Sequence, residues 1–286
     1  MILVTGATGN VGSRVVKELV AGGHAVRAFV TDENEARTLL GPKVELAKGS
    51  FDDRASLDAA LRGIDKMYLL APFQPGSMSA WEASTIDAAK RAGVKHVVKH
   101  SVAGAEYEPG ITIGRTHRAG EKLLEKSGMA WTFLRPAGFA SNALGWASTI
   151  KSQGAVYAPM GEGKMAVIDP RDIAAVAVAA LTTSGHEGKA YHLTGPEALS
   201  VAQQVKILGD VIGRPLKYVD VPDAAAKDSM LGMGMSAPAV DAMLELTNLV
   251  RAGQAAAVSN AVQTITGKPP RSFEAWARDN AAAFVG

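Results

Sequence analysis

The fold of this chain is decided at its start, where residues 1–19 read MILVTGATGNVGSRVVKEL. The β-branched run Ile2–Thr5 predicts a buried strand, and apolar residues at helical spacing from Val11 onward predict an amphipathic helix. Between them stand three glycines, each three residues from the next. Glycine is required where a chain turns sharply and where its main chain must approach a phosphate without a Cβ atom in the way. The helix that follows aims its unpaired N–H groups and positive dipole end at the same turn.

This strand, glycine turn and helix together predict a dinucleotide site. A glycine triplet alone is a weak signal, but here a strand precedes it and a helix follows it, which is the required context. The alternative is a tight turn between strand and helix that holds no ligand. The residues expected to contact the diphosphate are Gly6, Thr8, Gly9, Asn10, Val11 and Gly12.

Short β-branched runs alternate with helical patterns through the rest of the first half. This alternation predicts repeated βαβ units and a parallel sheet with right-handed crossovers, and therefore a doubly wound α/β fold of the Rossmann type. The expected strands are Ile2–Thr5, Ala25–Val30, Val44–Ala47, Lys66–Ala71, His96–Ser101 and Trp131–Leu134.

The regularity weakens after residue 150, where glycine and proline become frequent. We therefore expect a dinucleotide-binding Rossmann domain over residues 1–150 and a smaller α+β substrate-binding part over residues 151–286, with some segments of the latter returning to the sheet. The elements expected in the second part are a helix starting at Asp169-Pro170, a strand at Ala190–Thr194, and helices at Val201–Ile212, Ala237–Arg251 and Phe273–Phe284.

The composition argues against several kinds of site. The net charge of +2 comes from mixed acids and bases without a basic stripe, so we expect no nucleic-acid partner. The chain has no Cys, and no cluster of histidines and carboxylates suggests a metal site. The longest apolar stretch, Ile173–Leu181, is too short to span a membrane, and no signal-peptide pattern precedes the first strand. We expect a cytoplasmic protein, and the sequence leaves its oligomeric state open.

Further motifs follow in order along nearly the whole chain. They are the G-x-x-G-x-x-G spacing, Phe51-Asp52-Asp53, Leu70-Ala71-Pro72, and the stretches SGMAWTFLRP (residues 127–136), IDPRDIA (168–174), HEGKAY (186–191) and LTGP (193–196). Together they resemble the NmrA-like atypical short-chain dehydrogenases. The resemblance implies an NAD(P)H-dependent reductase, similar to members of that group that act on azo compounds, triphenylmethane dyes and quinones. It is specific for family and fold, and much less so for substrate.

The resemblance also places further cofactor contacts after successive strands. They are Thr31, Asp32, Ser50, Phe51, Ala71, Pro72, Phe73 and Pro136. An acid after the second strand binds the ribose hydroxyls of NAD, whereas an Arg there accepts the 2′-phosphate of NADP. NADP-using relatives carry Arg where Thr31 stands, and this chain places acids nearby, so we expect NAD(H) to be slightly favoured over NADP(H). Against this, Arg27 or Arg37 could reach a phosphate, and Asp32 could merely cap the next helix.

The usual catalytic pair of short-chain dehydrogenases is missing. That pair is a Tyr with a Lys four residues later, and none of the five tyrosines has Lys at this place. Alignment with the family puts His117 and Glu121 there, on one helix face. Hydride transfer needs no proton relay when the acceptor is electron-poor and delocalised, and His117 could supply a proton afterwards. Ser101, after the fifth strand, is expected to face the nicotinamide. The alternatives are a supporting or surface role for His117 and a strand-terminal hydroxyl for Ser101.

Large apolar residues in loops and helix starts would suit a flat aromatic substrate. The expected substrate contacts are Tyr107, Phe139, Asn142 and Trp146. We therefore expect a reductase of quinone-like or azo-like acceptors. The alternative is a non-catalytic dinucleotide sensor that binds partner proteins, as NmrA-like regulators do. The missing Tyr–Lys pair motivates that alternative.

Overall fold

The computed structural model describes residues 1–285, and the chain divides into two compact units. The first unit comprises residues 1–136 and 170–192, and the second comprises residues 137–169 and 193–285. This division differs from the expected boundary at residue 150. The chain leaves the first unit where a sheet strand ends at Pro136, and it comes back at the helix that begins at Pro170.

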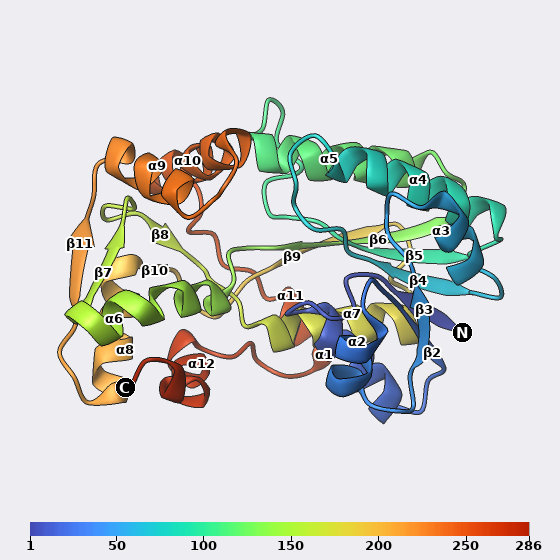
Figure 1. The fold of residues 1–286 in the computed structure, drawn as a ribbon, viewed down its shortest axis with the longest axis horizontal. Helices are drawn as coiled ribbons and strands as arrows, with labels where there is room; N and C mark the ends of the chain where they lie inside the picture. The colour runs from blue at the N-terminus through green and yellow to red at the C-terminus, as the bar shows by residue number, and fades with distance from the viewer. Residues whose placement is uncertain (286) are drawn as a thin grey trace. The chain divides into compact units, whose positions relative to one another are not determined.

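A parallel sheet forms the centre of the first unit (Figure 1). Its strands are β1 (Ile2–Val4), β2 (Val26–Val30), β3 (Glu45–Lys48), β4 (Lys66–Leu69), β5 (His96–His100), β6 (Ala130–Pro136) and β9 (Lys189–Leu193). The strand order is β3-β2-β1-β4-β5-β6-β9, and the pairs from β3 through β6 are all parallel. This order confirms the predicted doubly wound fold. It also puts the point where the chain reverses direction across the sheet between β1 and β4, which is where such folds bind ligands.

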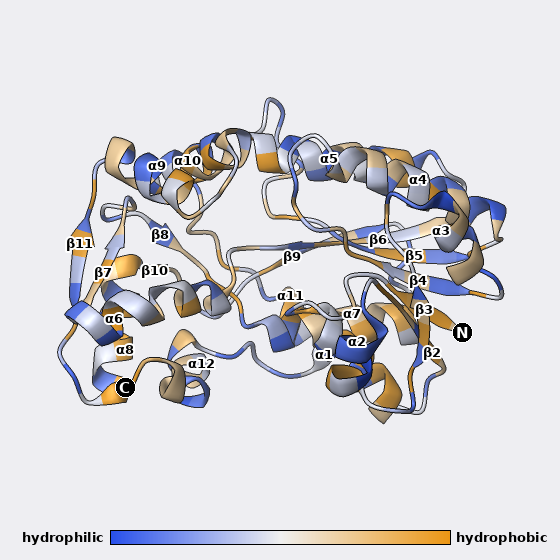
Figure 2. Ribbon diagram, viewed as in Figure 1, coloured by the Kyte–Doolittle hydropathy of each residue, from blue (hydrophilic) through white to orange (hydrophobic). Residues whose placement is uncertain are grey.

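Helices cover both faces of this sheet. They are α1 (Gly12–Ala21), α2 (Glu33–Leu40), α3 (Arg54–Ala60), α4 (Met78–Arg91), α5 (Thr112–Glu125) and α7 (Pro170–Thr182). Figure 1 shows α3, α4 and α5 on one face and α1, α2 and α7 on the other. Buried apolar residues of β1, β4, β5 and β6 pack under α3 and α4. Figure 2 shows α7 as mainly apolar and α2 as polar. Helix α7 is apolar because it packs on both α1 and the sheet.

The second unit is built from short strands and helices. Its strands are β7 (Ala155–Ala158), β8 (Lys164–Met165), β10 (Leu199–Ser200) and β11 (Lys217–Asp220). Its helices are α6 (Ala147–Gln153), α8 (Val201–Ile212), α9 (Asp223–Gly232), α10 (Ala237–Arg251), α11 (Ala261–Thr266) and α12 (Phe273–Asp279), with 3₁₀ turns η1 (Ala140–Trp146) and η2 (Ala281–Ala283). The strands pair as β7 with β11 and β8 with β10. Helices α8 and α12 pack together around Phe273, Trp276 and Phe284.

Most predicted elements lie within two residues of their observed bounds, and α8 and α10 match them fully. The predicted helix Phe273–Phe284 is wrong in its second half, since α12 ends at Asp279 and a 3₁₀ turn follows. The side-chain amide of Asn280 donates to the carbonyl of Trp276 at 2.8 Å, and such local bonds compete with helix continuation. None of the helices described over residues 1–285 is long and apolar enough to cross a lipid bilayer.

Candidate functional site

The predicted cofactor residues all lie in the first unit, at or just beyond the carboxyl ends of strands. They follow β1 (Gly6, Thr8, Gly9, Asn10, Val11 and Gly12), β2 (Thr31 and Asp32), β3 (Ser50 and Phe51) and β4 (Ala71, Pro72 and Phe73), and Pro136 ends β6. Because parallel strands end at one edge of their sheet, these residues share that edge. It is the edge expected for a dinucleotide, and the individual contacts stay predictions.

The glycine turn brings the start of α1 against the end of β1. Gly6 has a φ of +60°, and its carbonyl accepts from the N–H of Gly9 at 3.0 Å. A Cβ atom on Gly12 would overlap the Gly6 carbonyl oxygen and lie 2.7 Å from its carbonyl carbon. Only glycine permits this approach. The residue before the helix is Val11, and no side chain caps the helix N-terminus. The N–H of Ser13 donates instead to the main-chain carbonyl of Gly9 at 3.0 Å, so the turn itself completes this end of the helix. The positive end of the α1 dipole still lies at the glycine turn, where it favours an anion.

Thr5 ties the two strands at the point where the strand order reverses. Its hydroxyl accepts from the N–H of Leu70 at 2.8 Å and donates to the Leu70 carbonyl at 3.0 Å. These two bonds hold the loop after β4, which contains Ala71, Pro72 and Phe73, beside the glycine turn. Ala71 is buried, whereas Pro72 is exposed and Phe73 is half-buried. Two loops that diverge from adjacent strands form the crevice of a doubly wound fold.

Asp32 caps helix α2. Its Oδ1 accepts from the main-chain N–H groups of Asn34 at 2.8 Å and Glu35 at 3.0 Å. These two bonds, the one from Glu35 first, hold the pKa of Asp32 below its ordinary value, and nearby Lys48 acts in the same direction. The alternative interpretation from the sequence, a helix cap, is therefore present in the structure. Contact with a ribose through the other carboxylate oxygen stays a prediction.

The two arginines considered for a 2′-phosphate are both engaged elsewhere. Arg27 donates from Nε to Glu45 at 2.7 Å and from Nη1 to the carbonyls of Ala60 and Arg62. Arg37 donates to three carbonyls that follow its own helix, those of Gly41, Pro42 and Val44. Either arginine would have to give up these bonds to meet a phosphate.

Two other cations near this edge were missed from the sequence. Lys48 ends β3 and is close enough to Asp32 to affect its ionisation. Arg14 lies in the first turn of α1, where its guanidinium donates to the carbonyl oxygen of Asn10 and to its side-chain oxygen at 2.6 Å. The position of Arg14, two residues after the last glycine of the turn, could have signalled it.

Ser50 and Phe51 follow β3 beside an aromatic pair. The ring of Phe51 stacks on Trp81 of α4 with centroids 5.8 Å apart, and meets Phe29 edge-on at 5.9 Å. The Trp81 indole N–H donates to Asp52 at 2.6 Å, which fixes its ring. The hydroxyl of Ser50 accepts from the N–H of Asp52 at 3.2 Å. These bonds give the loop after β3 a fixed shape with a half-buried aromatic surface.

Ser101 comes directly after β5 and is 2% exposed. Its hydroxyl donates to Oε1 of Glu121 on α5 at 2.6 Å. The guanidinium of Arg135 on β6 grips the same carboxylate, from Nε to Oε1 at 2.9 Å and from Nη2 to Oε2 at 2.7 Å. Burial opposes ionisation of Glu121, but the hydrogen bonds from Arg135 and Ser101 outweigh it and hold its pKa below the ordinary value. Ser101 therefore belongs to a charged cluster that the sequence did not reveal.

His117 lies one turn before Glu121 on the same helix and is 7% exposed, which excludes the surface role considered for it. Burial, aided by the positive charge of Lys99 and by His100, holds the pKa of His117 well below its ordinary value. The imidazole is therefore neutral at pH 7. Its Nδ1 is buried and has no hydrogen-bond partner within residues 1–285. A neutral imidazole with an unpaired nitrogen can hold one proton, but it is a weak acid.

A buried ion pair lies next to these groups. Lys99 of β5 and Glu82 of α4 are both fully buried and hydrogen-bonded to each other. Gly120 of α5 packs against this pair, because a Cβ atom there would overlap Glu82. Breaking such a pair leaves an uncompensated charge in the interior. The pair was not predicted, since its two members lie on separate elements and neither belongs to a motif.

The four predicted substrate contacts are divided between the two units. Tyr107 is in the first unit and 61% exposed. Phe139, Asn142 and Trp146 are in the second unit. There Phe139 bridges to Ile168 through its main chain, Asn142 is exposed, and Trp146 packs against the unit's core. Their substrate roles stay predictions.

Two histidines, His96 and His100, stand four residues apart, the spacing of a metal-binding pair on a helix, but they lie on a strand. His96 and His100 both belong to β5, where His96 bonds to Thr132 at 2.9 Å and His100 to the hydroxyl of Tyr68 at 2.7 Å. Over residues 1–285 no three histidine or carboxylate side chains are grouped so that they could hold a metal ion.

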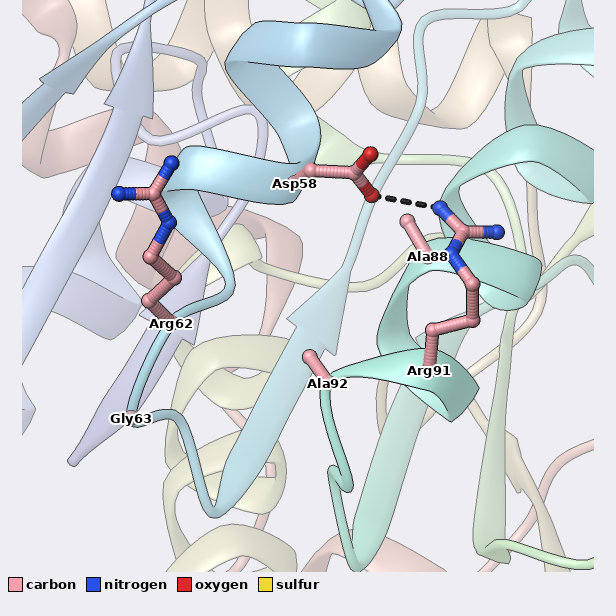
Figure 3. Close-up of a pocket in the computed structure, with 6 residues that line it drawn as sticks. All are labelled: Asp58, Arg62, Gly63, Ala88, Arg91 and Ala92. Carbon is pink, nitrogen blue, oxygen red and sulfur yellow. Dashed lines mark hydrogen bonds and ion pairs between the residues drawn. The ribbon is translucent and has the colours of Figure 1, made fainter.

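A hollow of about 410 Å³ lies elsewhere in the first unit, between the ends of α3 and α4 (Figure 3). Asp58 and Arg91 form an ion pair of 2.5 Å across it, and Arg62 points away from that pair. Its residues lead into the amino ends of β4 and β5, the edge opposite the glycine turn. It therefore does not belong to the candidate site.

The fold agrees with the comparison to protein families. The model of the NmrA-like family matches residues 1–276. The chain belongs to the NmrA-like family. This NmrA-like protein is 43% identical over 284 residues to an NAD(P)H azoreductase of Xenophilus azovorans, covering 99% of both chains. It is 42% identical over 289 residues to a (4-alkanoyl-5-oxo-2,5-dihydrofuran-3-yl)methyl phosphate reductase of Streptomyces griseus, covering 100% of this chain and 99% of the other.

A solved structure of similar fold is the NADPH-dependent quinone oxidoreductase QOR2 of Escherichia coli in complex with NADPH. The match has a TM-score of 0.87 at 27% identity and covers 99% of each chain. The family resemblance read from the sequence is thus confirmed over nearly the whole NmrA-like chain.

Proposed function

We propose that this NmrA-like protein is an NAD(P)H-dependent reductase of electron-poor conjugated acceptors, such as quinones and azo compounds. The observation that carries the proposal is the pair of residues at the Tyr–Lys positions. One is a buried neutral imidazole, and the other is a carboxylate already gripped by Arg135. Neither is a strong proton donor. An acceptor that spreads the incoming electron pair over several atoms needs no such donor.

The residues at the carboxyl ends of the parallel strands would have the following roles. The glycine turn and the N-terminus of α1 bind a diphosphate, and the bound dinucleotide supplies the hydride when reduced. Ser101, after β5, and His117, on α5, would orient bound groups, and Glu121 would hold the Ser101 hydroxyl. The acceptor gains one hydride and then one proton, and the proton comes from solvent or from the His117 N–H, which refills from solvent.

The names of the relatives support this class of acceptor. An azo group, a quinone and an oxo-dihydrofuran each contain a polarised conjugated system that can accept hydride at one end and hold the electron pair at the other. The substrate of this chain is accordingly proposed as a small conjugated, aromatic or quinone-like molecule.

We further propose that NADH binds at least as tightly as NADPH. Asp32 carries a negative charge near the expected ribose, and Arg27 and Arg37 are held by other groups. A carboxylate about 5 Å from a phosphate would cost on the order of 3 kcal/mol at an effective dielectric of about 20, before screening by salt. Lys48 and Arg14 act in the opposite direction. Calorimetric titration with both reduced cofactors tests the preference, and clearly tighter NADPH binding would refute it.

The reductase proposal is tested by following the absorbance of reduced cofactor with purified protein. Quinones and azo dyes should be reduced, whereas simple ketones and aldehydes, which need a proton donor, should not. Cofactor binding without oxidation by any conjugated acceptor would contradict the reductase and favour a dinucleotide sensor.

A further inference from the structure

The Ser101, Glu121 and Arg135 side chains form what we call the serine clamp. Its geometry fixes the direction of every hydrogen bond in it. An ionised carboxylate has no proton to donate, and a guanidinium has only donors. Glu121 is ionised because Arg135 and Ser101 outweigh its burial and hold its pKa low. The single proton of the Ser101 hydroxyl must therefore point at Glu121, as the 2.6 Å contact shows.

A hydroxyl that has committed its proton can only accept further bonds. The oxygen of Ser101 therefore offers its lone pairs to a group that carries an N–H or O–H. The main chain holds this oxygen in place, because the N–H of Ser101 donates to the Leu134 carbonyl at 2.7 Å and the N–H of Ala103 donates to the Pro136 carbonyl at 2.9 Å.

The position of Ser101 along the sheet indicates which group this is. A dinucleotide in a doubly wound fold crosses the carboxyl edge with its diphosphate at the turn after the first strand. Here β2 and β3 lie on one side of β1, and β4 and β5 lie on the other. If the adenosine half lies over β2 and β3, the nicotinamide half lies over β4 and β5. Ser101, directly after β5, is then at the nicotinamide end, whose carboxamide carries N–H donors.

We propose that Glu121 is a positioning residue which, held by Arg135, turns the Ser101 hydroxyl into a fixed acceptor for the carboxamide N–H of the nicotinamide ring. The proposal rests on the proposed function only in taking a nicotinamide dinucleotide as the ligand. Glu121 acts through Ser101 and contacts neither cofactor nor substrate itself. The arrangement fixes the orientation of the ring about its bond to the ribose.

The charge of Glu121 is shared with a second arginine, which supplies a matched control. Arg118 donates to Oε2 of Glu121 at 3.1 Å and to Glu125 at 2.8 Å. Glu125 is on the same helix and exposed, and it has no bond to Ser101 or Arg135. The substitution Glu125→Gln therefore removes the same charge from the same helix without changing the serine clamp.

The test measures binding alone, with NAD(H) and with its 3-acetylpyridine analogue, which replaces the carboxamide by an acetyl group and so has no N–H donor. The ratio of the two dissociation constants measures how much the hydrogen bond from the carboxamide N–H contributes to binding. We expect the wild type to prefer the carboxamide by about tenfold, the value of one hydrogen bond. Glu121→Gln and Ser101→Ala should each lower this preference to within about twofold, and Glu125→Gln should leave it unchanged.

The double variant Ser101→Ala/Glu121→Gln should show no further loss beyond Ser101→Ala, because Glu121 acts only through the serine. Additive losses, or an unchanged ratio in Glu121→Gln, would overturn the proposal. If thermal unfolding shows that Glu121→Gln is poorly folded, Glu121→Asp serves instead, since the shorter side chain keeps the charge but withdraws the carboxylate from the Ser101 hydroxyl; it too should lower the preference to within about twofold. Normal binding without turnover would refute the reductase while leaving the clamp intact, so the two failures are distinguishable.

Discussion

Substituting Gly12 by alanine tests the glycine turn most directly. The new Cβ atom would overlap the Gly6 carbonyl oxygen and lie 2.7 Å from its carbon. Both atoms are main chain, so relief requires the start of α1 to move away from the turn, by about 1 Å to restore van der Waals contact. A hydrogen bond of about 2.9 Å stretched by that amount exceeds the usual limit and is lost.

The magnitude follows from the number of bonds that such a shift removes. Loss of about two N–H bonds to a charged diphosphate, at about 1.5 to 3 kcal/mol each, amounts to at least 3 kcal/mol or about a hundredfold in affinity. The overlap itself should cost about 1 to 3 kcal/mol of folding free energy. Calorimetric titration with NADH and NADPH measures the first quantity, and chemical denaturation without cofactor measures the second.

Substitutions at two other glycines serve as controls. A Cβ atom on Gly9 would lie 3.2 Å from the Gly6 carbonyl oxygen, a contact that a small shift relieves, so Gly9→Ala should weaken binding less. A Cβ atom on Gly145 would meet nothing within 4 Å, so Gly145→Ala should bind like the wild type. If Gly12→Ala retained wild-type affinity for both cofactors, the argument that this turn binds the diphosphate would be refuted.

Three other outcomes are expected. Lys99→Met leaves the buried Glu82 carboxyl without its cationic partner, and burial, which already raises the pKa of Glu82, then favours uptake of a proton. The variant should lose about 3 to 5 kcal/mol in chemical denaturation, whereas adding Glu82→Gln should recover much of the loss. Equal instability of the single and double variants would argue against the pair. Burial, aided by Lys99, lowers the pKa of His100 to about 3, so the folded state keeps this imidazole neutral, and its contribution to stability is present above pH 6.5 and lost as the pH falls toward about 3. Replacing His100 by Asn should reduce the slope of unfolding free energy against pH by about 1.4 kcal/mol per pH unit below pH 6.5, and an unchanged slope would contradict this. Asp32→Ser removes the negative charge, so the ratio of NADPH to NADH affinity should rise by about tenfold or more. Because serine keeps a capping oxygen, the unfolding temperature should change little. An unchanged affinity ratio would show that Asp32 does not face the ribose.

The parts of the fold that depend on local pattern could be predicted from the sequence. The helices α8 and α10 have the predicted bounds because their ends carry local signals, such as the capping serine Ser200 before α8. The first six strands are signalled by short apolar runs that alternate with helical patterns. The boundary at 150 was not predictable in this way, since α7 has an ordinary apolar helical pattern and nothing local shows which unit it joins.

The same distinction applies to the site. The glycine turn is local, so its spacing was enough to predict it. The serine clamp joins residues from a strand end, a helix and a neighbouring strand, and its bonds depend on where long side chains end. The ion pair between Arg27 and Glu45 also joins two different elements, so the sequence does not predict it. The cytoplasmic location and the substrate contacts remain predictions.

The return of the chain to the first unit has a consequence for its synthesis on the ribosome. Helix α7 packs against α1 and against β4, β5 and β6, and β9 completes the sheet beside β6. A nascent chain that has emerged only as far as Pro136 therefore exposes the apolar surface that α7 will cover. The first unit can be completed only after α7 and β9 have also left the exit tunnel, so a fragment ending at Pro136 should require a chaperone to stay dispersed.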